Sequence, residues 1–351
     1  MAGMQSRFYV RSCPRAVLKF AQLIIQPDPV SLQFIQATIA EDMRAVDAVI
    51  HARLQSEVVL INQVAAHIVN SGGKRLRPVL VLLSAGTFGH ITPQHHELAA
   101  VVEFIHTATL LHDDVVDESS MRRGQATVNT VFGNAASVLV GDFVYSRAFQ
   151  MMVGLHNMRV MSVLADATNV IAEGEVLQLL NCHDADVSDE AYLKVIHYKT
   201  AKLFEAATRL GAIICGASEA DENAMAEYGM RIGTAFQLID DVLDFSGDSS
   251  EIGKNVGDDL SEGKPTLPLL YARRHGNAQQ KQVIRHAIEN GGLDELPLVL
   301  QAVRETGALD YVRKLAKIEA DSACAAISKL PASIYQEALI ELSAFAVSRT
   351  Y

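Results

Sequence analysis

The stretch LLHDDVVDESSMRRG, residues 110–124, is the most informative part of the sequence for predicting the fold. Apolar residues run directly into Asp113, Asp114 and Asp117, and two arginines follow. If the stretch is helical, Asp113 and Asp117 lie one turn apart on the same face, where like charges repel each other. Such a spacing is unfavourable for helix stability alone, so we expect a cationic ligand between these carboxylates.

Most of the chain beyond Ser31 carries apolar residues at helical spacing. Val46, Val49, Ile50 and Leu54 are one example, and similar patterns recur toward the C-terminus. We find no alternating strand pattern bounded by turn residues, and no internal repeat. The sequence therefore predicts an all-α fold in a single domain over residues 31–351.

Start and stop signals divide this domain into helices. The segment 70–73, Asn-Ser-Gly-Gly, ends one helix, and Thr92-Pro93 begins another with a capping residue and a first-turn proline. Further starts are predicted at Gly133-Asn134, Ser188-Asp189 and Ser218. Long helices are predicted around 93–117, 135–155, 158–181 and 219–245. Because these helices are apolar on most faces, we expect them inside a bundle.

The composition bounds the class of protein. The chain has 351 residues, of which 49% are hydrophobic and 20% charged, as in globular proteins. Its net charge of −11 argues against a nucleic-acid partner. No uncharged apolar run reaches the roughly 18 residues of a membrane helix, so we predict no transmembrane segment. The four cysteines have no metal-ligand spacing and are expected to be reduced thiols.

The N-terminus allows two interpretations. Residues 1–26 contain four basic residues and no acidic one, as in a short organelle-targeting segment. The same composition fits an extension without a role in the fold, which Pro27 and Pro29 would separate from the helices. We predict a disordered extension over residues 1–30 and a cytoplasmic protein, and an organelle-targeting role for residues 1–27 stays open.

A second acidic cluster occurs in FQLIDDVLDF, residues 236–245. Asp240, Asp241 and Asp244 repeat the DDxxD spacing of the first cluster within a similar apolar context. Two carboxylates ~4 Å apart repel each other by about 4 kcal/mol at an effective dielectric constant of 20. A solvated acidic helix face would explain one such cluster, but two in buried-looking helices need counter-cations. Hard oxygen ligands in this number suit Mg²⁺, which completes its coordination with water and phosphate oxygens.

Basic residues follow helix breaks at several points and indicate a phosphate ligand. GGKRLRP, residues 72–78, places Lys74, Arg75 and Arg77 after two glycines, which let the backbone approach a ligand. Guanidinium groups bind phosphate oxygens in a bidentate manner. The other cations are Arg122, Arg123, Lys199, Lys254 and Lys264. A run of cations alone is usually solvated surface, but their alternation with paired aspartates predicts a site for Mg²⁺ and diphosphate.

These residues also carry a family resemblance. GGKRLRP, EFIHTATLLHDDVVDESSMRRG, KTAKLF, GTAFQLIDDVLDF and GKNVGDDLSEGKPTLPLL resemble, in order, the motifs of trans-isoprenyl diphosphate synthases, the polyprenyl synthase family. The resemblance extends from about residue 40 to the C-terminus, and AFQMM and GEVLQLLN are most similar to the bacterial octaprenyl diphosphate synthases. It implies a bundle of long helices around a central cavity, a homodimer, and Mg²⁺ as cofactor.

The resemblance also implies roles for individual residues. The magnesium ligands would be Asp113, Asp117, Asp240 and Asp244, and the catalytic set would add Asp114, Asp241 and Lys199. The allylic diphosphate would contact Arg122, Lys199, Thr200, Gln237 and Lys254. Isopentenyl diphosphate would bind Lys74, Arg77, Arg123 and His106, with Arg75 as a further candidate. His106 lies two helical turns before Asp113, which favours a ligand contact over a core role.

The implied reaction adds isopentenyl units to an allylic diphosphate such as farnesyl diphosphate. The product expected from the resemblance is octaprenyl diphosphate for the ubiquinone side chain. Ala108 and Thr109 are small and lie one turn before Asp113, so we expect them to admit a long chain, with Met152 as a wall or floor. The alternatives are a shorter-chain synthase of the geranylgeranyl type and a subunit of a heteromeric synthase. A di-iron bundle would need Glu-x-x-His ligands on two helices, and the sequence has that spacing only once, at Glu103–His106. A terpene cyclase usually lacks the Gly-Gly-Lys-Arg segment.

Overall fold

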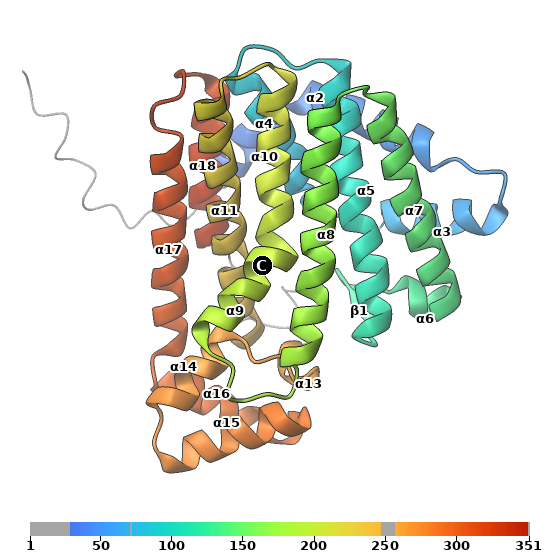
Figure 1. The fold of residues 1–351 in the computed structure, drawn as a ribbon. Helices are drawn as coiled ribbons and strands as arrows, with labels where there is room; N and C mark the ends of the chain where they lie inside the picture. The colour runs from blue at the N-terminus through green and yellow to red at the C-terminus, as the bar shows by residue number, and fades with distance from the viewer. Residues whose placement is uncertain (1–28, 71, 247–256, 350–351) are drawn as a thin grey trace, which may run out of the picture.

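Helices form almost the whole of this computed structural model, which describes residues 29–70, 72–246 and 257–349 (Figure 1). The elements are α1 (Pro29–Thr38), α2 (Ala40–Leu54), α3 (Val59–Asn70), α4 (Leu76–Thr87), α5 (Pro93–Val116), β1 (Met121–Arg122), β2 (Gln125–Ala126), α6 (Val128–Phe132), α7 (Asn134–Gly154), α8 (Met158–Asn181), α9 (Asp189–Ile196), the π-helical turn η1 (His197–Ala201), α10 (Lys202–Ile214), α11 (Glu219–Ser246), α13 (Asp258–Ser261), α14 (Leu267–His275), α15 (Ala278–Asn290), the 3₁₀ turn η2 (Leu293–Glu295), α16 (Leu296–Glu305), α17 (Ala308–Ala326) and α18 (Ile334–Ser348). The all-α prediction is confirmed.

The predicted helix boundaries are confirmed where capping chemistry sets them. At the start of α5, Pro93 occupies the first turn and Thr92 forms a reciprocal capping box with His95. The side chain of Ser188 accepts a hydrogen bond from the backbone N–H of Ala191 and caps α9. The helix predicted to end at the Asn-Ser-Gly-Gly segment ends at Asn70.

The core lies between α4, α5, α10 and α11. Almost every residue of α4 is buried, and this helix packs against α10 and α5. The 28-residue helix α11 packs along α10 and α17, which lie beside it in Figure 1. Helices α7 and α8 depart from the expectation of full burial, because Leu139 on α7 is 67% exposed and Leu180 on α8 is 73% exposed.

One short hairpin was not predicted. Strands β1 and β2 pair Met121 with Ala126 and Arg122 with Gln125. Arg123 and Gly124 form the turn, with φ angles of 52° and 73°. Strands of two residues are too short to produce a recognisable alternation of apolar and polar residues, so the sequence pattern could not indicate them.

Two predictions concern the chain as a whole. Among the described helices, none is both long and apolar enough to cross a bilayer. The predicted N-terminal extension lies almost entirely outside the described residues, which begin at Pro29 with α1.

Candidate active site

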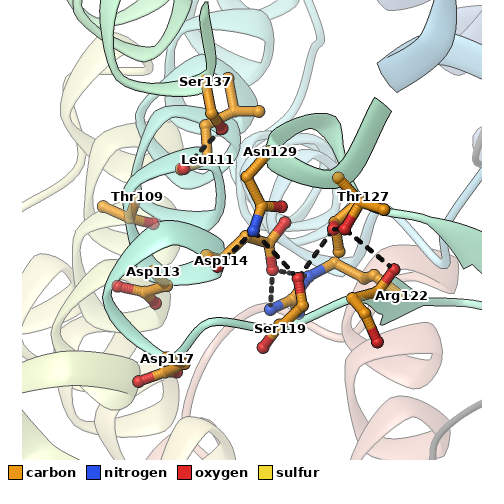
Figure 2. A network of polar contacts seen from close by, with 12 residues as sticks. Thr109, Leu111, Asp113, Asp114, Asp117, Ser119, Arg122, Thr127, Asn129 and Ser137 are labelled. Carbon is orange, nitrogen blue, oxygen red and sulfur yellow. Dashed lines mark hydrogen bonds and ion pairs between the residues drawn. The ribbon is translucent and has the colours of Figure 1, made fainter. Parts of the chain in front are cut away.

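The first acidic cluster lies at the C-terminal end of α5. Figure 2 shows Asp113 and Asp117 on one side of the helix, with Thr109 on that same side, and Asp114 turned away from them. Asp114 is buried, and two guanidinium nitrogens of Arg122 lie 2.7 and 2.8 Å from its Oδ1. Burial raises the pKa of Asp114, and the charge of Arg122 opposes that shift. The cluster therefore has two outward carboxylates, Asp113 and Asp117, and one inward carboxylate, Asp114, which binds Arg122 in the β1–β2 hairpin.

The second acidic cluster lies near the end of α11, where Asp244 is half-buried and its Oδ2 atom is inaccessible to solvent. Asp241 is buried, accepts a hydrogen bond from the hydroxyl of Tyr192, and accepts another from Gln237 Nε2 at 2.9 Å. Burial and then the charge of Asp259 raise the pKa of Asp241 to about 8. Asp240 is half-buried and pairs at 2.6 Å with Arg349, near the end of α18.

Lysine side chains neutralise the outward aspartates of the first cluster. Lys199 Nζ, on η1, lies 3.4 Å from Asp113 Oδ2 and 2.6 Å from Glu175 Oε2. Lys264 Nζ lies 2.8 Å from Asp117 Oδ2 and also pairs with Glu262. Burial alone would lower the pKa values of both lysines, but the surrounding carboxylates raise them. Both ammonium groups are therefore held charged beside the aspartates.

The structure brings together some, but not all, of the residues predicted to bind the allylic diphosphate. Thr200 Oγ1 donates a hydrogen bond to Gln237 Oε1 at 3.0 Å, so these two side chains lie together beside Asp241. Arg122 faces Asp114 and not the outward carboxylates. Lys254 lies outside the described residues.

The glycine pair before α4 brings the basic residues together. Gly73 has a φ of 144°, which other residues rarely adopt, and a Cβ atom there would overlap the guanidinium of Arg123, so glycine favours this close approach. Arg123 in turn donates a hydrogen bond to the carbonyl oxygen of Gly72. Arg75, in the left-handed region with φ 46°, forms an ion pair with Asp47 on α2.

A cavity of about 90 Å³ opens beside these residues. Its polar lining includes Arg75, Glu103, His106 and Arg123, and apolar side chains such as Ile50, Phe104 and Leu111 line it as well. Burial and then the charges of Arg77 and Arg123 lower the pKa of His106 well below its ordinary value, so the imidazole is neutral at pH 7. The predicted set of His106, Arg123 and Arg75 thus converges on one cavity.

Lys74 and Arg77 lie next to that set, toward the second acidic cluster. Lys74 Nζ lies 5.6 Å from the ring centre of Phe345, and the guanidinium of Arg77 lies 4.7 Å from that of Phe204. Burial lowers the pKa of Lys74 to about 8 and that of Arg77 to about 10. The Nε of Arg77 is buried and has no hydrogen-bond partner among the described residues, so it is available to a ligand oxygen.

The residues predicted to set the length of the product lie on α5 and α7. Ala108 is fully buried, and Thr109 is half-buried and donates its hydroxyl hydrogen bond to the carbonyl oxygen of His106 at 2.8 Å. Thr109 lies one turn before Asp113 on the same side of α5 (Figure 2). Met152 is fully buried on α7, which packs against α5.

The donor set fits magnesium bound together with a phosphate. The candidate ligands Asp113, Asp117, Asp240 and Asp244 are carboxylates near the ends of α5 and α11, and lysine side chains lie against Asp113 and Asp117. Mg²⁺ typically takes one or two carboxylates and completes its shell with water and phosphate oxygens. Within residues 29–70, 72–246 and 257–349, no group of three or more acidic, histidine or cysteine side chains converges to hold a metal ion without such a ligand. This arrangement differs from the convergent carboxylates of a di-iron bundle.

Sequence reasoning missed several residues at this site. Tyr192 contacts Asp241, Glu175 contacts Lys199, and Arg349 contacts Asp240, each from a different segment of the chain. Lys264 stood out only as a positive charge after a helix break, and its pairing with Asp117 depends on tertiary packing. Glu175 follows Gly174 in GEVLQLLN, and a glycine inside an apolar helix beside an acidic residue is a signal that could have identified it.

Comparisons with known proteins agree with this geometry. Residues 58–303 match the family model described as polyprenyl synthetase. The octaprenyl diphosphate synthase of Escherichia coli is 54% identical over 320 residues, covering 91% of this chain and 99% of that protein. The all-trans-nonaprenyl-diphosphate synthase of Rhodobacter capsulatus is 45% identical, covering 90% and 98%.

Solved structures give the same assignment. The polyprenyl synthase of Caulobacter crescentus, crystallised with calcium and isoprenyl diphosphate, superposes with a TM-score of 0.88 at 44% identity, covering 91% of this chain and 98% of that one. The aspartate clusters, the cations between them and these matches over most of the chain lead to one conclusion. The protein is a prenyltransferase and belongs to the polyprenyl synthetase family.

Proposed function

We propose that this protein condenses isopentenyl diphosphate onto farnesyl diphosphate, one five-carbon unit at a time, to make octaprenyl diphosphate. The observation that carries the proposal is the pair of aspartate clusters, on α5 and α11, with lysine and arginine side chains against them. The 54% identity to an octaprenyl diphosphate synthase over nearly its full length supports the product.

The acidic and basic residues would bind the allylic substrate by its diphosphate. Asp113, Asp117, Asp240 and Asp244 are the proposed magnesium ligands. When bound, Mg²⁺ would withdraw charge from the diphosphate oxygens and make the group easier to expel. Lys199 would contact the same diphosphate and stabilise the negative charge that develops on it as the carbon–oxygen bond breaks. The carbonyl and hydroxyl oxygens near Thr200 and Gln237 would face the allylic cation.

The second substrate would occupy the basic cavity. Lys74, Arg77, Arg123 and His106 are the proposed ligands of isopentenyl diphosphate, and the free Nε of Arg77 supports this assignment. The double bond of that substrate attacks the allylic cation, a new carbon–carbon bond forms, and a proton leaves to the departed diphosphate. The product is an allylic diphosphate five carbons longer, so the cycle can repeat.

The growing chain would run along α5 toward its N-terminus. From residue 113 to residue 101 the helix supplies a wall of ~18 Å at 1.5 Å per residue. The small side chains Ala108 and Thr109 leave the first turn of this path open, and Met152 is the proposed constriction. A geranylgeranyl-type product, four units long, is the alternative that a block at this turn would produce.

We also propose that the enzyme is a homodimer in the cytoplasm. The exposed apolar side chains Leu139 on α7 and Leu180 on α8 are the kind of surface that a second copy would cover. Light scattering of the purified protein tests the oligomeric state. A tagged full-length protein tests the location and the targeting role of residues 1–27.

The direct test of the proposed function is incubation of the purified protein, expressed alone, with farnesyl diphosphate, labelled isopentenyl diphosphate and Mg²⁺. The expected result is a ladder of products ending at eight units. Products that stop at four units would favour the geranylgeranyl type. Absence of turnover would favour a subunit of a heteromeric synthase.

A further inference from the structure

Helix α8 touches the catalytic segment at a glycine. A Cβ atom on Gly174 would lie 2.7 Å from the backbone nitrogen of Lys199 and 2.8 Å from Tyr198 Cβ. Any other residue at position 174 would therefore push α8 away from η1. The close contact places the next residue, Glu175, directly against the Lys199 side chain.

The π-helical turn η1 directs two neighbouring side chains to different partners. Such turns add one residue to a helical turn and are frequent at functional sites. Thr200 bonds Gln237 on α11, whereas Lys199 points toward α5 and α8. The position of Lys199 between α5 and α8 thus depends on what holds its ammonium group.

Two carboxylates share that ammonium unequally. Lys199 Nζ lies 2.6 Å from Glu175 Oε2 but 3.4 Å from Asp113 Oδ2. The three side chains are only 20%, 28% and 16% exposed for Lys199, Glu175 and Asp113. Water screens such a group weakly, so the nearer carboxylate determines where the ammonium lies.

We propose that Glu175 is a positioning residue that holds Lys199 back from Asp113 and so keeps Asp113 available to the metal. The inference rests on the proposed function, because it assigns Asp113 to magnesium. Without the Glu175 charge, the Lys199 ammonium would pair fully with Asp113 and compete with Mg²⁺ for it. Glu175 itself needs no contact with substrate or metal for this role.

The test is Glu175→Gln, which keeps the size of the side chain and removes its charge. We expect the Mg²⁺ concentration for half-maximal turnover to rise about tenfold or more, as for other partners of metal-ligating groups. Mn²⁺ binding in the presence of inorganic diphosphate, measured by electron paramagnetic resonance, should weaken by a similar factor. Glu175→Asp should recover part of the loss, because the charge is restored at a shorter reach.

A matched control lies two residues away. Glu173 is on the same helix, is exposed, and accepts a hydrogen bond from Asn169 one turn earlier. Glu173→Gln should leave both the Mg²⁺ requirement and Mn²⁺ binding unchanged. A general effect of lowering the negative charge of α8 would shift both variants equally and would overturn the proposal.

A double-mutant cycle separates positioning from a direct metal contact. In a Lys199→Met background, Glu175→Gln should have no further effect on Mn²⁺ binding, because the ammonium it restrains is gone. An equal effect with and without Lys199 would overturn the proposal, as would wild-type Mn²⁺ binding in Glu175→Gln. If the wild-type protein makes no product, the proposed function fails. If the wild-type protein is active and Glu175→Gln has the same Mg²⁺ requirement and Mn²⁺ binding, this inference fails and the proposed function stands.

Discussion

Lys264 Nζ lies 2.8 Å from Asp117 Oδ2 and so joins the end of α5 to the segment that follows the second acidic cluster. Asp117 is the last aspartate of the first cluster, and Lys264 follows it by 147 residues. The pair is mostly buried, and Glu262 pairs with the same ammonium. Lys264 therefore holds together carboxylates that would otherwise repel each other.

Replacing Lys264 by Met should lower the stability of the metal-free protein. The carboxylates of Asp117 and Glu262 lose their shared counter-ion, and we expect the free energy of unfolding to fall by about 3 kcal/mol. Mg²⁺ should restore part of that loss, because it can neutralise Asp117. Urea unfolding with and without Mg²⁺ measures both effects. Lys317→Met, which breaks an exposed pair with Asp321 on α17, is the control, and an equal loss in the two variants would argue against the assignment.

Asp113→Ala and Asp240→Ala should each lower turnover by about 10²-fold or more. Each change removes one carboxylate near the end of a helix and leaves the apolar core intact, so the helical circular dichroism should be retained. Asp321→Ala on the exposed face of α17 serves as the control. Near-normal turnover in both cluster variants would rule out the metal-ligand assignment.

Thr109→Tyr should shorten the product. The phenol ring would project from the side of α5 that carries Asp113, one turn below the diphosphate, and would fill the proposed path of the chain (Figure 2). We expect products of two to four units, measured by chain-length analysis. Met152→Ala should give products of equal or greater length. An unchanged product profile from active Thr109→Tyr protein would exclude this path.

Acid should destabilise the fold through His95. Burial lowers the pKa of His95 to about 4, although a hydrogen bond with the backbone of Gly211 opposes the shift. An unfolded histidine titrates near 6.5, so between these values only the unfolded chain takes up the proton, and stability falls as pH falls.

The expected loss is about 2 to 3 kcal/mol between pH 7 and pH 4.5, in addition to what other groups contribute. His95→Gln isolates it, because glutamine can also accept the hydrogen bond from the backbone N–H of Thr92. The difference in unfolding free energy between wild type and His95→Gln should shrink over this range. Parallel pH profiles would show that His95 does not carry the effect.

The sequence was sufficient to predict the features that depend on the spacing of nearby residues. Asp113 and Asp117 lie four residues apart, so a helix places them on one side, and the repeat at Asp240 and Asp244 identified a second set. Helix starts at Thr92 and Ser188 followed from capping chemistry, which also acts within a few residues.

Contacts between distant segments could not be predicted in the same way. Tyr192 and Asp241 are 49 residues apart, and their hydrogen bond depends on how α9 packs beside α11. The spacing of the aspartates also gives no sign that Asp114 and Asp241 turn inward. Their direction depends on partners, Arg122 and Tyr192, that tertiary packing places beside them.

The sequence left the covering of α7 and α8 open, although the apolar helix 135–155 was a candidate for a dimer interface. Helices that are apolar on most faces can be covered by other helices of the same chain or by a second copy, and the sequence pattern is the same in both cases. Leu139 and Leu180 are exposed in the single chain.

The central claim is that Asp113, Asp117, Asp240 and Asp244 hold metal ions on the diphosphate of the allylic substrate. Anomalous diffraction from crystals grown with Mn²⁺ and a non-hydrolysable thiolodiphosphate analogue of farnesyl diphosphate tests it most directly. We predict manganese peaks between the outward aspartates and the diphosphate, with Asp114 and Asp241 still bonded to Arg122 and Tyr192. Manganese bound only elsewhere, or a diphosphate bound away from both clusters, would contradict the account.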